Sequence, residues 1–94
     1  MSESIDVRCE PTGDSWTCFV TVTGGGTSTN HAVTMTAADL ARFGPGGDTP
    51  DELVRRSFEF LLAREPKASI LGQFDLPVIG RYFPDYEREI TRRR

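Results

Sequence analysis

The sequence predicts an α+β fold, in which a three-stranded antiparallel sheet is covered on one face by helices. Two observations support this prediction. Apolar and polar residues alternate with a period of two in the first third of the chain, as in strands that bury one face. From residue 50 onward, apolar residues recur at intervals of three and four, as on one face of a helix. The chain has 94 residues, so we expect a single domain, with a β-meander over 1–36 and a helical part over 37–94.

The first two strands, at about 4–10 and 15–23, are predicted to form a hairpin. The "GD" pair at 13–14 suits a two-residue turn with Gly at the first central position. This turn places Cys9 opposite Cys18, and it sets apolar residues opposite one another along the inner face. The agreement between turn and pattern supports the register.

The two cysteines fall on a non-hydrogen-bonded pair of the hairpin, where the Cα atoms come within about 4.5 Å. That geometry permits a disulfide between Cys9 and Cys18. However, the start "MSESIDVRCE" has neither the basic nor the apolar region of a signal peptide, which makes the cytoplasm the default compartment. Because cytoplasmic thiols are kept reduced, we expect two reduced core thiols and treat the disulfide as disfavoured.

The segment "GGGTSTN", at 24–30, is predicted to be a flexible polar connection to a third strand at about 30–36. A triple-glycine turn would return this strand beside the second one. Thr36 and Asp39 then resemble a capping box, which predicts a short helix that ends at Gly44.

The "TPDE" segment gives the strongest boundary signal. Thr49 at the N-cap, Pro50 at the first helical position and Glu52 two residues later predict the start of the main helix. The helix is expected over about 50–64, because Pro66 cannot continue it. We expect it to pack across the sheet through its apolar face, which comprises Leu53, Val54, Ser57, Phe58, Leu61 and Leu62.

Prolines and glycines allow only short helices after residue 66. We expect one turn at 67–71, a second helix capped by Asp75 that runs to about Tyr82, and a third opened by Pro84. This third of the chain is rich in aromatic and aliphatic side chains for such short elements. Part of this surplus closes the core, and an exposed remainder would indicate a partner.

Four aromatic residues are candidates for that partner surface. Phe60 lies at the edge of the main helix's apolar face, Tyr82 and Tyr86 carry polar tips, and Phe19 lies on the outer face of the sheet. We interpret Phe58 and Phe83 as core residues.

The sequence offers no catalytic, cofactor-binding or metal-binding residues. His31 is the only histidine, so a His–nucleophile pair would have to combine it with Ser28, Thr29 or a cysteine. We expect it on the surface or on an edge strand. Two cysteines and this distant histidine do not complete a zinc site. A strand and no lysine follow the Gly-rich segment, which excludes a P-loop.

The net charge argues against nucleic-acid binding, and the hydropathy of the chain argues against a membrane-spanning helix. The net charge is −3, and only the tail "REITRRR", at 88–94, is basic. Three terminal arginines would bind phosphate weakly and without sequence preference. No apolar run approaches the length of a transmembrane helix.

The segment "SFEFLLAREPKASILGQFDLPVIGRYFPDYE" resembles a group of short bacterial proteins, common in actinobacteria, with no assigned activity. The shared pieces are "FEFLL", "REP", "SIL", "FDL", "YFP" and "YE". The resemblance implies no catalytic or binding residues.

The order of three strands and a "GDTPDELV" helix is also similar to the HicB-like antitoxin plan. Here "AADLARFGPGG" is inserted before the helix, and no recognisable DNA-binding segment follows.

These observations predict a small non-enzymatic cytoplasmic protein that needs no cofactor. We expect it to act by binding another protein or by self-association as a homodimer. The alternative is an antitoxin-like regulator that contacts nucleic acid through the arginine tail or as a dimer.

Overall fold

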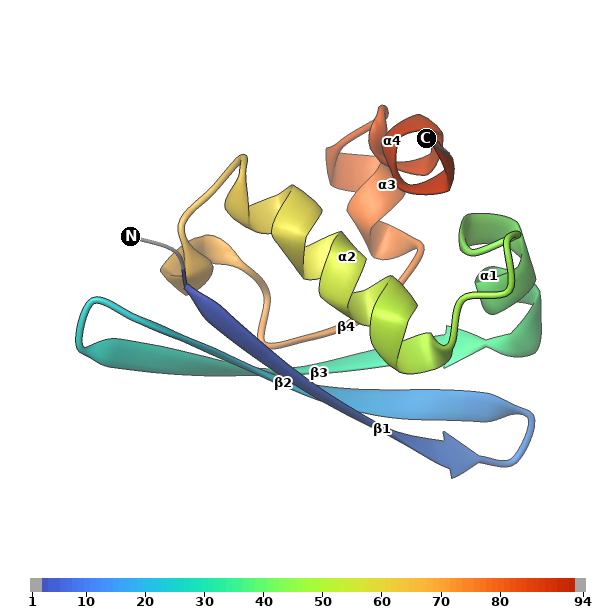
Figure 1. The fold of residues 1–94 in the computed structure, drawn as a ribbon, viewed down its shortest axis with the longest axis horizontal. Helices are drawn as coiled ribbons and strands as arrows, with labels where there is room; N and C mark the ends of the chain where they lie inside the picture. The colour runs from blue at the N-terminus through green and yellow to red at the C-terminus, as the bar shows by residue number, and fades with distance from the viewer. Residues whose placement is uncertain (1–2, 93–94) are drawn as a thin grey trace.

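The computed structural model describes residues 3–92 and shows two layers. A four-stranded sheet forms one layer, in the order β1-β2-β3-β4, and the helices lie together on one of its faces (Figure 1). The opposite face carries the polar residues of the strands. An antiparallel sheet with one solvated face produces the alternation seen in the sequence.

Strands β1 (Ser4–Thr12) and β2 (Ser15–Gly24) form the predicted hairpin. The predicted register is confirmed, since Cys9 lies opposite Cys18 and the turn falls between Thr12 and Ser15. Strand β3 (Thr27–Thr36) pairs antiparallel with β2.

The predicted glycine turn returns β3 beside β2, but it is tight, and residues 27–29, expected as part of a flexible connection, belong to β3. Gly25 and Gly26 have φ values of 62° and 81°, which only glycine adopts without steric cost. Two such residues match the twist of the flanking strands, so both strands extend to the turn.

The sheet has a fourth strand that the sequence did not predict. Strand β4 (Gln73–Asp75) lies parallel to β3, so the sheet is mixed and not a three-stranded antiparallel meander. Its backbone bonds run from Ala32 N to Gly72 O and from Leu76 N to Thr34 O, both 2.8 Å. Three residues show no periodicity, and only the return of the chain beneath the helices brings them to the edge of β3. Asp75 was expected to cap a helix. It lies in β4 instead and caps no described helix.

Helices α1 (Ala37–Phe43) and α2 (Pro50–Leu62) begin at the predicted residues. In α1, Asp39 N donates to Thr36 Oγ1 and Thr36 N donates to an Asp39 carboxylate oxygen, both at 3.0 Å. In α2, Thr49 and Glu52 make the same reciprocal pair at 3.0 and 3.2 Å. These bonds satisfy backbone donors that the helix itself leaves free.

The rest of the chain forms one 3₁₀ turn, η1 (Lys67–Ser69), and two short helices, α3 (Val78–Tyr82) and α4 (Tyr86–Thr91). The expected succession of short helices is therefore confirmed in outline. Pro77, rather than Asp75, precedes α3.

The core lies between the inner face of the sheet and α2, and a second contact extends it to the flank of α2. Phe60 is 9% exposed because its ring contacts Phe83 and Tyr86 edge-on, with ring centroids 5.9 and 5.3 Å apart. Tyr86 is fully buried. The expectation that Phe60 and Tyr86 are exposed is therefore wrong, because α4 covers the flank of α2.

His31 is also buried, at 4% exposure, which corrects the expected surface or edge position. β4 makes β3 an interior strand, and the imidazole packs against the Phe58 ring with centroids 5.2 Å apart. Its Nδ1 lies 2.8 Å from Leu71 O, and its Nε2 lies 2.8 Å from Thr29 Oγ1. Since a carbonyl only accepts, Nδ1–H donates to Leu71 O, and in the neutral imidazole Nε2 then accepts from Thr29 Oγ1.

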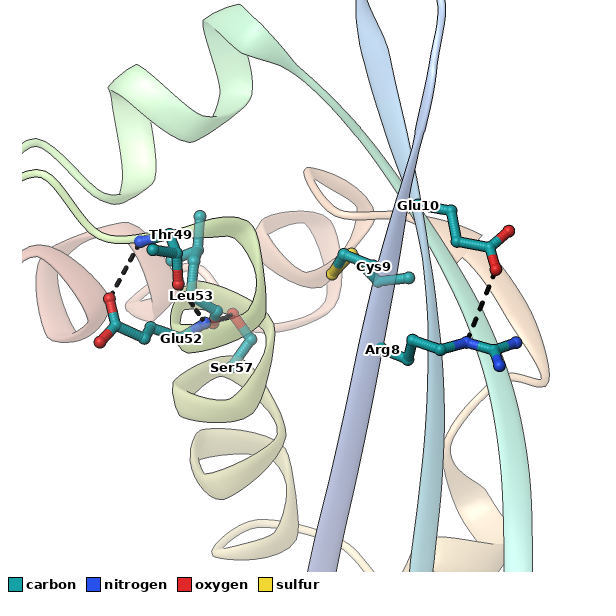
Figure 2. The surroundings of a disulfide bond; sticks show 8 residues. Arg8, Cys9, Glu10, Thr49, Glu52, Leu53 and Ser57 are labelled. Carbon is teal, nitrogen blue, oxygen red and sulfur yellow. Dashed lines mark hydrogen bonds and ion pairs between the residues drawn. A yellow bond between two sulfur atoms is a disulfide. The ribbon is translucent and has the colours of Figure 1, made fainter.

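A disulfide joins Cys9 to Cys18, whereas the sequence analysis favoured two reduced thiols. The register explains the bond, because it holds the two Cα atoms 3.9 Å apart with both side chains on the inner face. Figure 2 shows the disulfide pointing toward α2, while Arg8 and Glu10 point to the other side of the sheet.

None of the helices within residues 3–92 is long and apolar enough to cross a membrane.

Candidate binding groove

An open apolar groove of about 330 Å³ lies where the end of α2 meets β4 and α3. Its apolar lining comes from α2, the segment around β4, and α3, and includes Leu61, Ile70, Leu71, Phe74, Val78 and Ile79. Tyr82 and Phe83 complete the far wall. Apolar concavities with few polar groups are the usual form of a binding site.

The floor of the groove is buried, and the rim at the top of its walls is exposed. Leu61, Ile70 and Ile79 are each at most 7% exposed, so their packing fixes the floor. Leu71 is 47% and Tyr82 66% exposed, which makes them two of the three large hydrophobic side chains exposed in the described part of the chain. These rim residues would lose the most exposed area on contact with a ligand.

Strand β3 holds the wall that carries Leu71. The His31 bond to Leu71 O fixes the peptide unit of this residue, and the bond from Ala32 N fixes Gly72. A buried imidazole in the core thus positions an exposed leucine at the rim. The groove is therefore built on the sheet, not on a loose loop.

Glu65 is the single charged side chain of the lining. Within residues 3–92 it takes part in no ion pair or side-chain hydrogen bond, whereas its neighbour Arg64 is bound to Asp85 at 2.8 Å and lies over the Phe60 ring. The groove thus combines an apolar floor with one negative charge that is available to a cation.

The structure separates the four aromatic residues predicted for a partner surface. Tyr82 is exposed at the groove, and Phe19, 41% exposed, lies on the opposite face of the sheet beside Arg8. Phe60 and Tyr86 belong to the core. Glu65 was not predicted as a site residue, and Leu71 was not distinguished from the other apolar residues of the C-terminal third, since no local pattern marks them.

The described residues hold no cluster of three or more His, Cys, Asp or Glu side chains arranged for a metal ion. His31 lies opposite Val20 and Cys18 opposite Val33, so the two are not cross-strand partners. Thr29 does contact His31, but the imidazole is enclosed by the core. This arrangement offers no nucleophile with an exposed base.

The predicted contact of the arginine tail with phosphate falls partly outside the described residues, since only Arg92 of the three is described. Arg92 lies 3.4 Å from Glu89. Arg42, Arg56 and Arg64 are likewise paired with carboxylates. Arg8 and Arg88 also have a carboxylate partner, so that Arg55 and Arg81 are the two described arginines without an ion pair.

No protein-family model matches the chain, and no curated protein or solved structure is similar enough to count as a match. The resemblance to short actinobacterial proteins and the HicB-like plan therefore stay predictions.

Proposed function

We propose that this chain is a non-enzymatic binding module that holds a short segment of a partner protein in the groove at Leu71 and Tyr82. The observation that supports the proposal most is the pairing of an apolar floor with exposed rim side chains. Burying such a rim contributes about 25 cal/mol for each Å² removed from water. The volume suits one or two apolar side chains rather than a whole domain.

Glu65 supports a choice among such segments. A basic residue next to the apolar anchor would meet this carboxylate at the rim, where charge complementarity adds selectivity more than affinity. We therefore propose a ligand segment that carries an aliphatic or aromatic anchor flanked by Lys or Arg.

Selection from a displayed library of short peptides tests the proposal. We expect enriched sequences that share an apolar anchor beside a basic residue. Leu71→Arg should abolish binding of these peptides, because it places a charge at the apolar rim. Glu65→Gln should retain the anchor preference and lose the preference for the basic neighbour.

Phe19→Ser provides the matched control, because it removes an exposed aromatic side chain from the opposite face of the sheet. It should leave peptide binding unchanged. A selection that enriches nothing, or peptides that bind Leu71→Arg as well as the parent chain, would contradict the proposal.

The antitoxin-like alternative stays second. It has less support because six of the eight described arginines are paired with carboxylates and the net charge is negative. Nucleic acid that co-purifies with the chain and dissociates at high salt would favour it over the groove.

A further inference from the structure

Strand β1 is a long, unpaired edge of the sheet. It has nine residues and pairs only with β2, whereas the other edge, β4, has three. In an antiparallel ladder, the backbone groups of alternate residues point away from the partner strand. Counted from the two-residue turn, these residues are Ile5, Val7 and Cys9. Their N–H and C=O groups face the free edge, which is a template for another strand.

The side chains of β1 favour one kind of additional strand. Ile5, Val7 and Cys9 are half-buried and pack against the core cluster, so they are its rim. Asp6 and Arg8 are exposed on the opposite face, and alternate with these residues along the strand. An added strand with the same alternation would extend both the core and the charged face.

We propose that the added strand is β1 of a second copy of this chain, paired antiparallel about a two-fold axis at Val7. Val7 then lies opposite its own equivalent, and Ile5 lies opposite the second copy's Cys9. Both Asp6–Arg8 pairs are brought directly opposite one another across the axis. The two sheets join into one continuous sheet, with about six new backbone hydrogen bonds.

Charge and backbone hydrogen bonding favour this register over those in which the two-fold axis lies at a neighbouring residue of β1. An axis at Arg8 would place Arg8 opposite itself and Asp6 opposite Glu10, which are like-charge contacts. An axis at Cys9 would place Val7 opposite Pro11, which has no N–H to donate. An axis at Asp6 would place this carboxylate opposite itself. Only the axis at Val7 retains all backbone donors and pairs opposite charges.

Two features at the ends of β1 agree with this pairing. Pro11 lies beyond the residues that pair, so its missing N–H costs no bond. Arg55 donates to Ile5 O from α2, but a carbonyl oxygen has two lone pairs and can also accept from the second copy's strand.

Charge variants test the dimer and its register together. The parent chain should be a dimer in size-exclusion chromatography with light scattering. Asp6→Arg alone and Arg8→Asp alone each create two like-charge contacts, so each should raise the dimer dissociation constant by about tenfold or more. An equimolar mixture of these two variants should form a heterodimer, because every contact across the axis is then between opposite charges. Native mass spectrometry distinguishes this species by its mass.

Asp14→Arg at the hairpin turn and Arg81→Asp on α3 are the matched controls, because both residues are exposed and lie outside the paired segment. They should leave the dimer unchanged, as should Leu71→Arg in the groove. Val7→Pro removes an edge-facing N–H without removing a bond to β2, and should give a folded monomer. A monomeric parent chain, a dimer insensitive to both charge variants, or a mixture that does not pair would each overturn the proposal.

Discussion

The hydroxyl groups of Ser57 and Tyr86 lie 2.7 Å apart in the core and join α2 to α4. Both residues are fully buried. Ser57 Oγ also lies 2.8 Å from Leu53 O, to which it can only donate. Tyr86 therefore donates its proton to Ser57, and the chain from Tyr86 through Ser57 to the backbone leaves neither hydroxyl without a partner.

Removing both hydroxyls should cost less than the sum of the costs of removing each one alone. Ser57→Ala leaves the Tyr86 hydroxyl buried without an acceptor, and should lower the free energy of unfolding by about 1–3 kcal/mol. Tyr86→Phe should lower it by about 1 kcal/mol, because Ser57 keeps its bond to Leu53. The double variant should be more stable than the sum of the two effects predicts. Urea unfolding of all four chains measures this coupling, and additive effects would contradict the assigned bond.

Tyr86 should also make stability fall at alkaline pH. Burial raises the pKa of Tyr86 above its ordinary value near 10. The unfolded chain loses the phenolic proton first, so the contribution is complete below about pH 10 and declines above it by up to about 1.4 kcal/mol per pH unit. Tyr86→Phe should remove this part of the slope. Tyr82→Phe, which changes an exposed tyrosine, should retain it.

The bond between α1 and α4 should produce a dependence on acidic pH. Arg42 donates to Glu87 through Nε and Nη2, at 3.2 and 2.7 Å, and this hydrogen bonding holds the Glu87 pKa below its ordinary value. The stabilisation is thus complete above the unfolded pKa, near 4.3, and is lost as the pH falls through the folded pKa. Glu87→Gln should be less stable than the parent chain at neutral pH and equally stable in strong acid. A stability difference that does not change with pH would contradict this assignment.

The disulfide should stabilise the folded chain, and its presence in purified protein should depend on the redox state of the compartment in which the chain is produced. Reduction should lower the free energy of unfolding by about 2–3 kcal/mol, as for a closed loop of this length. The variant with Cys9→Ala and Cys18→Ala should not respond to reductant. Thiol titration of denatured, unreduced protein should find no free thiol in chain from an oxidising compartment and two in chain kept in the cytoplasm.

Residue patterns over a few positions were enough to predict the local elements. Alternation and a two-residue turn defined the β1–β2 register, and the Thr36 and Thr49 caps defined where α1 and α2 begin. Each of these depends on residues within a few positions of one another, whose backbone bonds and side-chain directions are fixed by local geometry. The exposure of Phe19 followed from the same alternation.

The features that no local pattern predicted all depend on contacts between distant parts of the chain. β4 is a strand because β3 offers it an edge, and that pairing buries His31, which then fixes Leu71 at the groove. Phe60 and Tyr86 are buried because α4 packs on the flank of α2. The edge position of Phe60 on the helix and the polar tip of Tyr86 had predicted exposure. Such contacts join residues that are tens of positions apart, and their free energy depends on a chain path that no local pattern encodes.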